Sequence, residues 1–132
     1  MQSIVLDTNV LVMSISARNV YHKVWQAFLQ GDYTLCVSNE ILEEYVEVLT
    51  RNINARVAVV YAILTRWNVR KLDPHYRFHL IKADEDDNKF VDCAIAGNAR
   101  YIVTEDHHFD VLKEIPFPKV AVINIDDFAS QF

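Results

Sequence analysis

Short apolar runs of strand length alternate along this chain with longer stretches in which apolar residues recur at helical spacing. This alternation constrains the fold strongly, because strands joined through a helix within one sheet must run parallel. We therefore predict an α/β fold: a three-layer α/β/α sandwich with a central parallel sheet. The predicted strands are residues 3–6, 33–37, 77–82, 101–104 and 120–124, and the predicted helices are residues 20–30, 39–51, 55–67 and 87–99.

The size and composition of the chain favour one folded domain over residues 1–132. Hydrophobic residues make up 52% of the sequence, and there are only two glycines, which argues against a disordered or loop-rich chain. We find no linker, repeat or low-complexity segment. Predicted helix 55–67 carries apolar side chains at helical spacing, and we expect this side to face the core. Its members are Val57, Val60, Tyr61, Leu64 and Trp67.

Cysteine usage and hydropathy indicate a cytoplasmic protein. Cys36 and Cys93 each lie within an apolar segment and lack CxxC spacing, so we expect buried, reduced thiols. No apolar run approaches the length of about 18 residues that a membrane span requires. The first residues lack a basic region and reach an acid at Asp7, unlike a signal peptide.

Acidic residues occur where several predicted strands end or where the following helices begin. Asp7 follows strand 3–6, and Asp106 follows strand 101–104. Glu44 and Asp92 each fall in the second turn of a helix that comes after a predicted strand. Because parallel strands present their carboxyl ends at one sheet edge, we expect these four acids to meet there. Asp87, at the start of helix 87–99, could approach the same edge, although capping of the helix is the stronger expectation for it.

A group of four carboxylates requires a compensating charge. Two unit charges about 4 Å apart repel by about 4 kcal/mol at an effective dielectric constant of 20. No Lys or Arg lies within six residues of Asp7. A divalent cation is the simplest compensation, and oxygen ligands suit Mg²⁺ or Mn²⁺. Since the sequence has no glycine-rich phosphate loop, metal-assisted hydrolysis of a phosphodiester is the favoured chemistry.

The ordered set of these motifs resembles the PIN domain family, most closely its stand-alone toxin-type (VapC-like) ribonucleases. The resemblance covers residues 1–128, nearly the whole chain. It is carried by Asp7-Thr8-Asn9-Val10-Leu11, by Ser38 with Glu44 six residues later, by the acidic run from Asp84 to Asp92, and by Val103-Thr104-Glu105-Asp106.

The resemblance implies a Mg²⁺- or Mn²⁺-dependent endoribonuclease that hydrolyses RNA. It also implies the toxin of a toxin–antitoxin pair, an antitoxin protein as partner, and a homodimer. Within this resemblance Asp7, Glu44, Asp92 and Asp106 match the catalytic, metal-binding acids. Asn9, Ser38 and Thr104 match supporting polar positions, and Asp87 is placed with them.

Several alternatives remain open at the level of sequence. Glu43 could replace Glu44 if the helix is rotated by one residue, and Asp110 could add a ligand or lie in a solvated turn. His107 and His108 lack a third His or Cys at matching spacing, so we expect them at the surface. Basic residues gathered between positions 66 and 82 could follow a phosphate backbone or form a solvated face.

Two other functions compete with the nuclease hypothesis. One is a binding module for nucleic acid or protein that keeps the fold without catalysis. The other is a phosphatase that uses Asp7 as nucleophile, but the second acid expected two residues later is replaced by Asn9.

Overall fold

The computed structural model describes residues 1–132 and contains a five-stranded, entirely parallel sheet with the strand order β3-β2-β1-β4-β5. The predicted fold class is confirmed. The strands are β1 (Ser3–Leu6), β2 (Thr34–Val37), β3 (Val69–Lys71), β4 (Tyr101–Val103) and β5 (Val122–Ile123). The α-helices are α1 (Thr8–Ile15), α2 (His22–Leu29), α3 (Asn39–Leu49), α4 (Ile53–Thr65), α5 (Asn88–Ala96) and α6 (Ile125–Ala129). Two 3₁₀ helices, η1 (Glu85–Asp87) and η2 (His107–Glu114), complete the fold.

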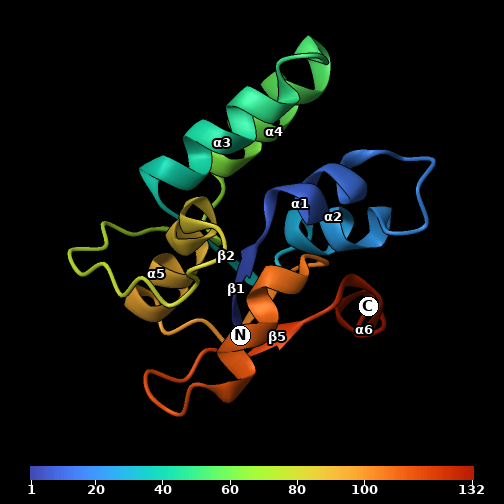
Figure 1. The fold of residues 1–132 in the computed structure, drawn as a ribbon. Helices are drawn as coiled ribbons and strands as arrows, with labels where there is room; N and C mark the ends of the chain where they lie inside the picture. Colours follow the sequence, from blue (N-terminus) through green and yellow to red (C-terminus); the bar gives the residue numbers. More distant parts are fainter.

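Helices cover both faces of the sheet. Figure 1 shows α5 to the left of the central strands and α1, α2 and α6 to the right. The core between these layers is one cluster of 32 buried hydrophobic residues, with β1, the middle strand, buried at Ile4, Val5 and Leu6. A strand covered on both faces is expected to be apolar throughout, as β1 is. Both cysteines are buried and unpaired, as predicted.

The third strand is not where the sequence pattern placed it. The predicted strand 77–82 was wrong: the strand is Val69–Lys71, which pairs with β2 through Leu35↔Val69 and Val37↔Lys71. Residues 77–81 belong to no strand or helix, and His79 adopts a positive φ of 51°, which a regular strand does not allow. The backbone of Ile81 is bonded instead by the side chain of Asn88.

Two features of the helices also differ from expectation. α1 follows β1 directly and was not predicted, although Asp7 caps it by accepting a hydrogen bond from the Thr8 N–H at 2.8 Å. On α4, the side expected to face the core is largely solvated, because Val57, Tyr61 and Leu64 are exposed. The buried residues of α4 are Val59, Ala62 and Ile63.

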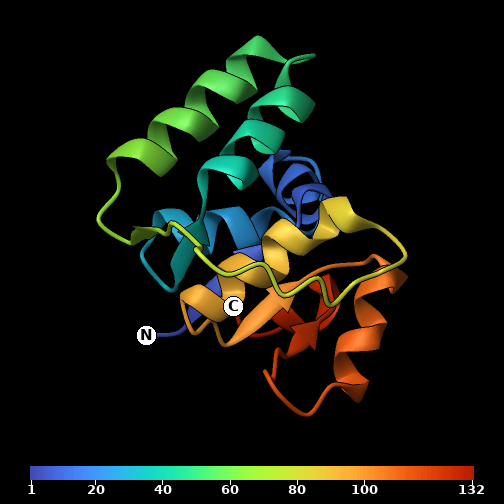
Figure 2. The ribbon, with the colours of Figure 1, turned by 60° about the vertical axis from the view of Figure 1, so that its left-hand side comes forward.

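The second of these differences follows from the shape of the fold. Helices α3 and α4 form a hairpin that projects away from the sheet (Figures 1 and 2), so only a narrow side of α4 packs on other elements. Trp67, also expected in the core, is 72% exposed. Its ring lies against Gly31, where an added Cβ would come within 2.7 Å of the indole.

No helix of the structure has both the length and the apolar character needed to cross a membrane.

Candidate active site

Two neighbouring strands deliver Asp7 and Asp106 to the same sheet edge. Leu6 of β1 lies opposite Val103 of β4, so both strands end at the same level. Thr104 links the two acids, because its hydroxyl donates to Asp7 Oδ2 at 2.7 Å and accepts from the Asp106 N–H at 3.0 Å. The predicted convergence of these two acids is therefore present, and Thr104 supports both.

Asp7 is a buried carboxylate at a helix N-terminus. Burial raises its pKa, while the hydrogen bonds from Thr104 and from the Thr8 N–H act in the opposite direction. The negative charges of Glu44 and Asp106 raise the pKa further. The peptide dipoles of α1 favour a negative charge at this position, which partly offsets the cost of burying it.

Glu44 joins the site from α3. Ser38 follows β2 and caps α3 by accepting from the Ile41 N–H, so Glu44 falls in the second turn. Its carboxylate accepts a hydrogen bond from the hydroxyl of Thr8. Glu43, the alternative, is exposed, which places Glu44 and not its neighbour at the site.

Lys89 of α5 is the built-in partner of Glu44. Its ammonium lies 2.7 Å from Glu44 Oε1 and 2.9 Å from Asp86 Oδ1, and its side chain is only 10% exposed. Burial alone would lower the pKa of Lys89, but the hydrogen bonds and charges of Glu44 and Asp86 raise it above its ordinary value. Glu44 is therefore neutralised within the protein, which the sequence did not indicate.

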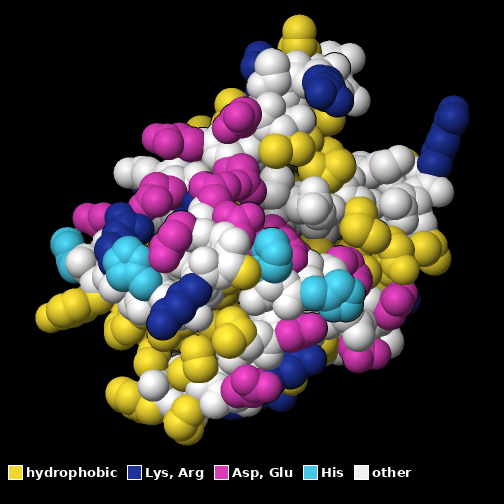
Figure 3. All heavy atoms as spheres, in the orientation of Figure 1, with side chains coloured by type: hydrophobic (Ala, Val, Ile, Leu, Met, Phe, Trp, Pro, Cys, Tyr) yellow, Lys and Arg dark blue, Asp and Glu magenta, His cyan; other side chains and the backbone are white.

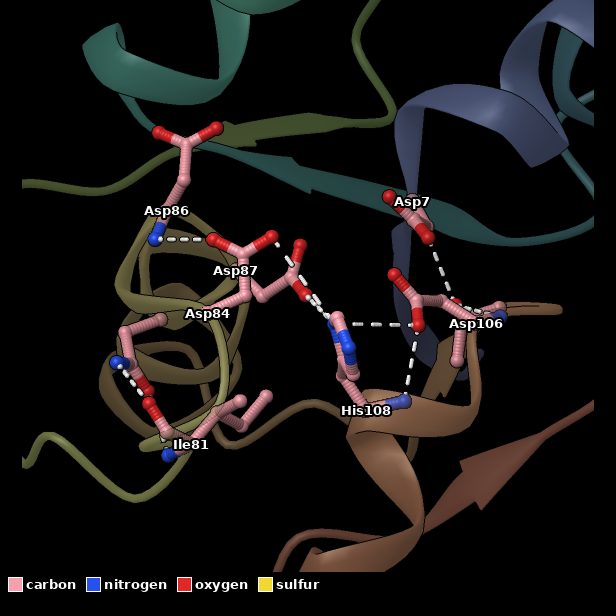
Figure 4. Close-up of polar contacts among 9 residues, drawn as sticks. Asp7, Ile81, Asp84, Asp86, Asp87, Asp106 and His108 are labelled. Carbon is pink, nitrogen blue, oxygen red and sulfur yellow. Dashed lines mark hydrogen bonds and ion pairs between the residues drawn. The ribbon is translucent and has the colours of Figure 1, made fainter.

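Asp87 approaches from the start of α5 and lies near Asp106 and Asp7. Burial raises the pKa of Asp87 to about 6, and the charges of Asp106, Asp84 and Asp7 add to this shift. The imidazole Nδ1 of His108 lies 3.3 Å from Asp87 Oδ2, and no Lys or Arg lies within 4.0 Å of this carboxylate. Figure 4 shows the ring of His108 between Asp84 and Asp87 on one side and Asp106 on the other.

Asp92 lies apart from this group. Its Oδ1 accepts a hydrogen bond from the Phe78 N–H at 3.1 Å, and Arg77 lies 4.0 Å from its Oδ2. Burial raises the pKa of Asp92, and the main groups that act on it besides are Phe78, Arg77, His79 and Glu40. Helical geometry explains the separation, since five residues rotate a side chain by about 140° from Asp87.

The remaining candidates are distributed between the site and the surface. Asn9 is exposed on α1, and no hydrogen bond of its side chain to the site is formed. Asp110 lies in η2, where its carboxylate contacts His107 and Lys113 and not Asp106. His107 and His108 are both exposed, as expected, and the ring of His108 also contacts acids of the site. Its position two residues after Asp106, in the first turn of a helix, was the available indication.

The three carboxylates of Asp7, Asp87 and Asp106, which we call the acidic trio, have no Lys or Arg within 4.0 Å. The trio lies where α1, α5 and η2 begin, and the N–H groups of Thr8 and His108 donate to Asp7 and Asp106. This environment favours anions but leaves the mutual repulsion of the acids uncompensated. The donors are oxygens, with one imidazole beside them, and Asp84, Asp87 and His108 alone offer ligand atoms within 4.8 Å of one another. Such a set fits Mg²⁺ or Mn²⁺.

The surface around the trio is acidic. Figure 3 shows Asp and Glu side chains gathered over the middle of this face, with Lys, Arg and His side chains to their left, over the region that α5 and the preceding segment occupy in Figure 1.

Comparison with known proteins decides the family. The model of the PIN domain family matches residues 3–108, which is most of the chain. The chain belongs to the PIN domain family. The resemblance inferred from the sequence motifs is thus confirmed. Among curated protein sequences, none matches this chain.

Solved structures with the same fold include PIN proteins from toxin–antitoxin complexes. A chain of VapBC2 from Rickettsia felis, crystallised with a promoter DNA fragment, has 18% identity and a TM-score of 0.63, covering 92% of this chain and 98% of that one. DNA-bound VapBC from Salmonella typhimurium gives 19% identity and a TM-score of 0.63, covering 95% and 99%. VapC20 from Mycobacterium tuberculosis, described as a toxin that cleaves the sarcin-ricin loop, gives 17% identity and a TM-score of 0.57, covering 81% and 92%.

Proposed function

We propose that this PIN domain protein is a Mg²⁺- or Mn²⁺-dependent endoribonuclease and the toxin of a toxin–antitoxin pair. The observation that carries the proposal is the acidic trio, held at the carboxyl edge of a parallel sheet without a Lys or Arg partner. The presence of toxins among the structural relatives, one of them named for cleaving an RNA loop, supports the choice of substrate and role.

In this proposal Asp7, Asp87 and Asp106 hold the metal ions. Glu44 lies beside these three acids, where it contacts the Thr8 hydroxyl and the Lys89 ammonium. Asp7, Glu44 and Asp106 keep the roles predicted from the sequence, whereas we assign to Asp87 the role that was predicted for Asp92. A bound divalent ion would supply an activated water and charge stabilisation for an in-line displacement at phosphorus.

The protein's own residues prepare the site for this chemistry. Thr104 and the Thr8 N–H fix both oxygens of Asp7, so its orientation is set before any ligand binds. The Asp106 carboxylate is fixed by the His108 N–H at 2.9 Å. Such preorganisation lowers the cost of positioning groups during the reaction.

Substitution of the strand-end acids tests the assignment. We expect Asp7→Asn and Asp106→Asn to lower Mn²⁺-dependent RNA cleavage by at least about 100-fold, because each removes a charge that binds the ion. Asn can still accept the capping hydrogen bonds, so circular dichroism and the melting temperature should change little.

Asp32→Asn is the matched control, since Asp32 is exposed and precedes β2 at the opposite edge of the sheet. Full cleavage by both Asp7→Asn and Asp106→Asn would refute the nuclease assignment. Absence of cleavage by the wild-type protein across an RNA panel, with RNA binding retained, would instead favour the non-catalytic binding module.

We also propose two protein partners: an antitoxin and a second copy of this chain. The supporting feature is the exposed apolar face of the α3–α4 hairpin, which contains a groove of about 350 Å³. The groove is lined by Val46, Arg56, Val57, Val60, Tyr61 and Leu64. Such a patch marks a protein contact more often than free surface. Two buried, unpaired cysteines fit the cytoplasm as the place where these complexes form.

A further inference from the structure

We propose that residues 71–82 bind a single-stranded stretch of RNA and direct it to the acidic trio. This inference rests on the proposed function and deepens it, because it names the surface that holds the substrate and the form of RNA that fits. The segment connects β3 to η1 and ends two residues before Asp84, which lies beside the trio.

The segment has a defined course, although it belongs to no helix and no strand beyond Lys71. Figures 1 and 2 show it running alongside α5. The Ile81 N–H donates to Asn88 Oδ1 at 2.9 Å, and Asn88 Nδ2 donates back to the Ile81 carbonyl at 2.8 Å. Asp92 accepts from the Phe78 N–H, and Ile81 is fully buried. Asp92 therefore serves to fasten this segment to α5.

Two aromatic side chains project from this anchored backbone into solvent. Tyr76 is 77% exposed and Phe78 is 39% exposed, with ring centroids 6.3 Å apart and planes inclined by 44°. The Tyr76 hydroxyl makes no hydrogen bond to another residue, so the ring is not needed to hold the loop. Exposed rings on a fixed backbone are the platform on which unpaired bases stack.

Basic side chains of the same segment remain available for phosphate groups. Lys71, His75 and Lys82 have no acidic partner within 4.0 Å. Arg77 and His79, in contrast, contact Glu40 and Glu85 at 2.6 and 3.0 Å and serve the protein itself. Of these three residues, Lys82 lies closest in sequence to the acids of the site. Its ammonium would attract the RNA phosphates towards the acidic trio, whose negative charges repel them.

A single strand fits this surface better than a duplex does. The bases of a duplex are stacked on one another and offer no free faces to Tyr76 and Phe78. Duplex binding without base contacts depends on a broad basic surface, whereas this chain carries a net charge of −5 and an acidic patch beside the segment.

Fluorescence anisotropy with a short labelled oligouridine tests the inference. Binding is measured in Mg²⁺ with the Asp7→Asn protein, for which the proposed function predicts cleavage at least about 100-fold slower than wild type, and with Asp7→Asn/Tyr76→Ala. We expect Tyr76→Ala to raise the Kd about tenfold, because one base–aromatic stack is lost. Tyr76→Trp should restore binding, since it keeps a stacking face.

Phe117→Ala is the matched control, because Phe117 is 88% exposed in the loop between η2 and β5, away from this segment. An unchanged Kd for Tyr76→Ala, or equally tight binding of a blunt RNA duplex, would overturn the inference while leaving the nuclease assignment intact. Cleavage of the probe by Asp7→Asn at the wild-type rate would instead refute the proposed function, and the inference with it. In the otherwise wild-type chain, Tyr76→Ala should raise KM with little change in kcat.

Discussion

At the scale of single residues, the exact position of an acid on a helix decides its chemistry. Asp87 and Asp92 lie on the same helix-forming stretch, and the sequence favoured Asp92 because it falls in the second turn. The structure turns Asp87 towards Asp106 and fastens Asp92 to Phe78. Sequence spacing could not resolve this, since the starting residue of α5 sets which way both side chains point.

Paired substitutions separate the roles of these two acids. Asp87→Asn should lower metal-dependent cleavage by at least about 100-fold, whereas Asp92→Asn should retain cleavage within about tenfold. Asn at position 92 can still accept from the Phe78 N–H, so the neighbouring segment keeps its course. Initial rates on one RNA at saturating Mn²⁺ provide the measurement, and the reverse order of effects would restore Asp92 as the metal ligand.

At the scale of elements, strongly apolar or well-capped stretches were predictable and edge elements were not. Strand 3–6 was predicted correctly because a strand buried on both faces is apolar throughout. The edge strand Val69–Lys71 has two exposed basic residues and is only three residues long, so its pattern resembles a loop. The apolar stripe of α4 was recognised but assigned to the core, since periodicity reports an apolar face without saying what covers it.

The exposed apolar face of the α3–α4 hairpin leads us to predict a homodimer. A self-complementary apolar patch can be buried by a second copy through an isologous contact. We expect the wild-type protein to sediment as a dimer and Tyr61→Lys to sediment as a monomer, since the substitution places an ammonium in the interface. The melting profile of Tyr61→Lys should still show a cooperative transition.

Tyr61 is a suitable position because it is 69% exposed, so its replacement disturbs no packing within one chain. Phe117→Lys provides a control of equal charge change at another exposed aromatic residue. A monomeric wild-type protein at concentrations well above those in cells would exclude the homodimer and leave the hairpin to the antitoxin.

At the scale of the whole molecule, parallel topology gathers residues that are remote in sequence. Asp7 and Asp106 are 99 positions apart, yet adjacent strands bring them to one edge, and this convergence was predictable from the strand pattern alone. The ion pair of Lys89 with Glu44 was not predictable, because it depends on how α5 packs beside α3, for which the sequence carries no periodic pattern. For His108, the one indication in the sequence was its place two residues after Asp106.

The uncompensated charge of the site couples metal binding to stability and pH. In the metal-free fold, burial raises the pKa of Asp87 to about 6, from an ordinary value of 3.8. A carboxyl group whose pKa is higher in the folded than in the unfolded state stabilises the fold fully when the pH is below its unfolded-state pKa. For Asp87 this contribution is lost as the pH rises through about 6. The metal-free protein should therefore lose stability relative to Asp87→Asn between about pH 4 and about pH 6.

Metal binding should act in the opposite direction, because a divalent ion binds the ionised carboxylates. At about pH 7.5, Mn²⁺ at 100 times its Kd should add about 2.7 kcal/mol, or about 10 °C in melting temperature. At about pH 5 the same concentration should add much less, since protons then compete for Asp87 and for Asp7, whose pKa is also raised. Differential scanning fluorimetry of wild type and Asp87→Asn over this pH range measures both effects. A Mn²⁺ shift that is the same in both proteins, or independent of pH, would show that the ion binds outside the acidic trio.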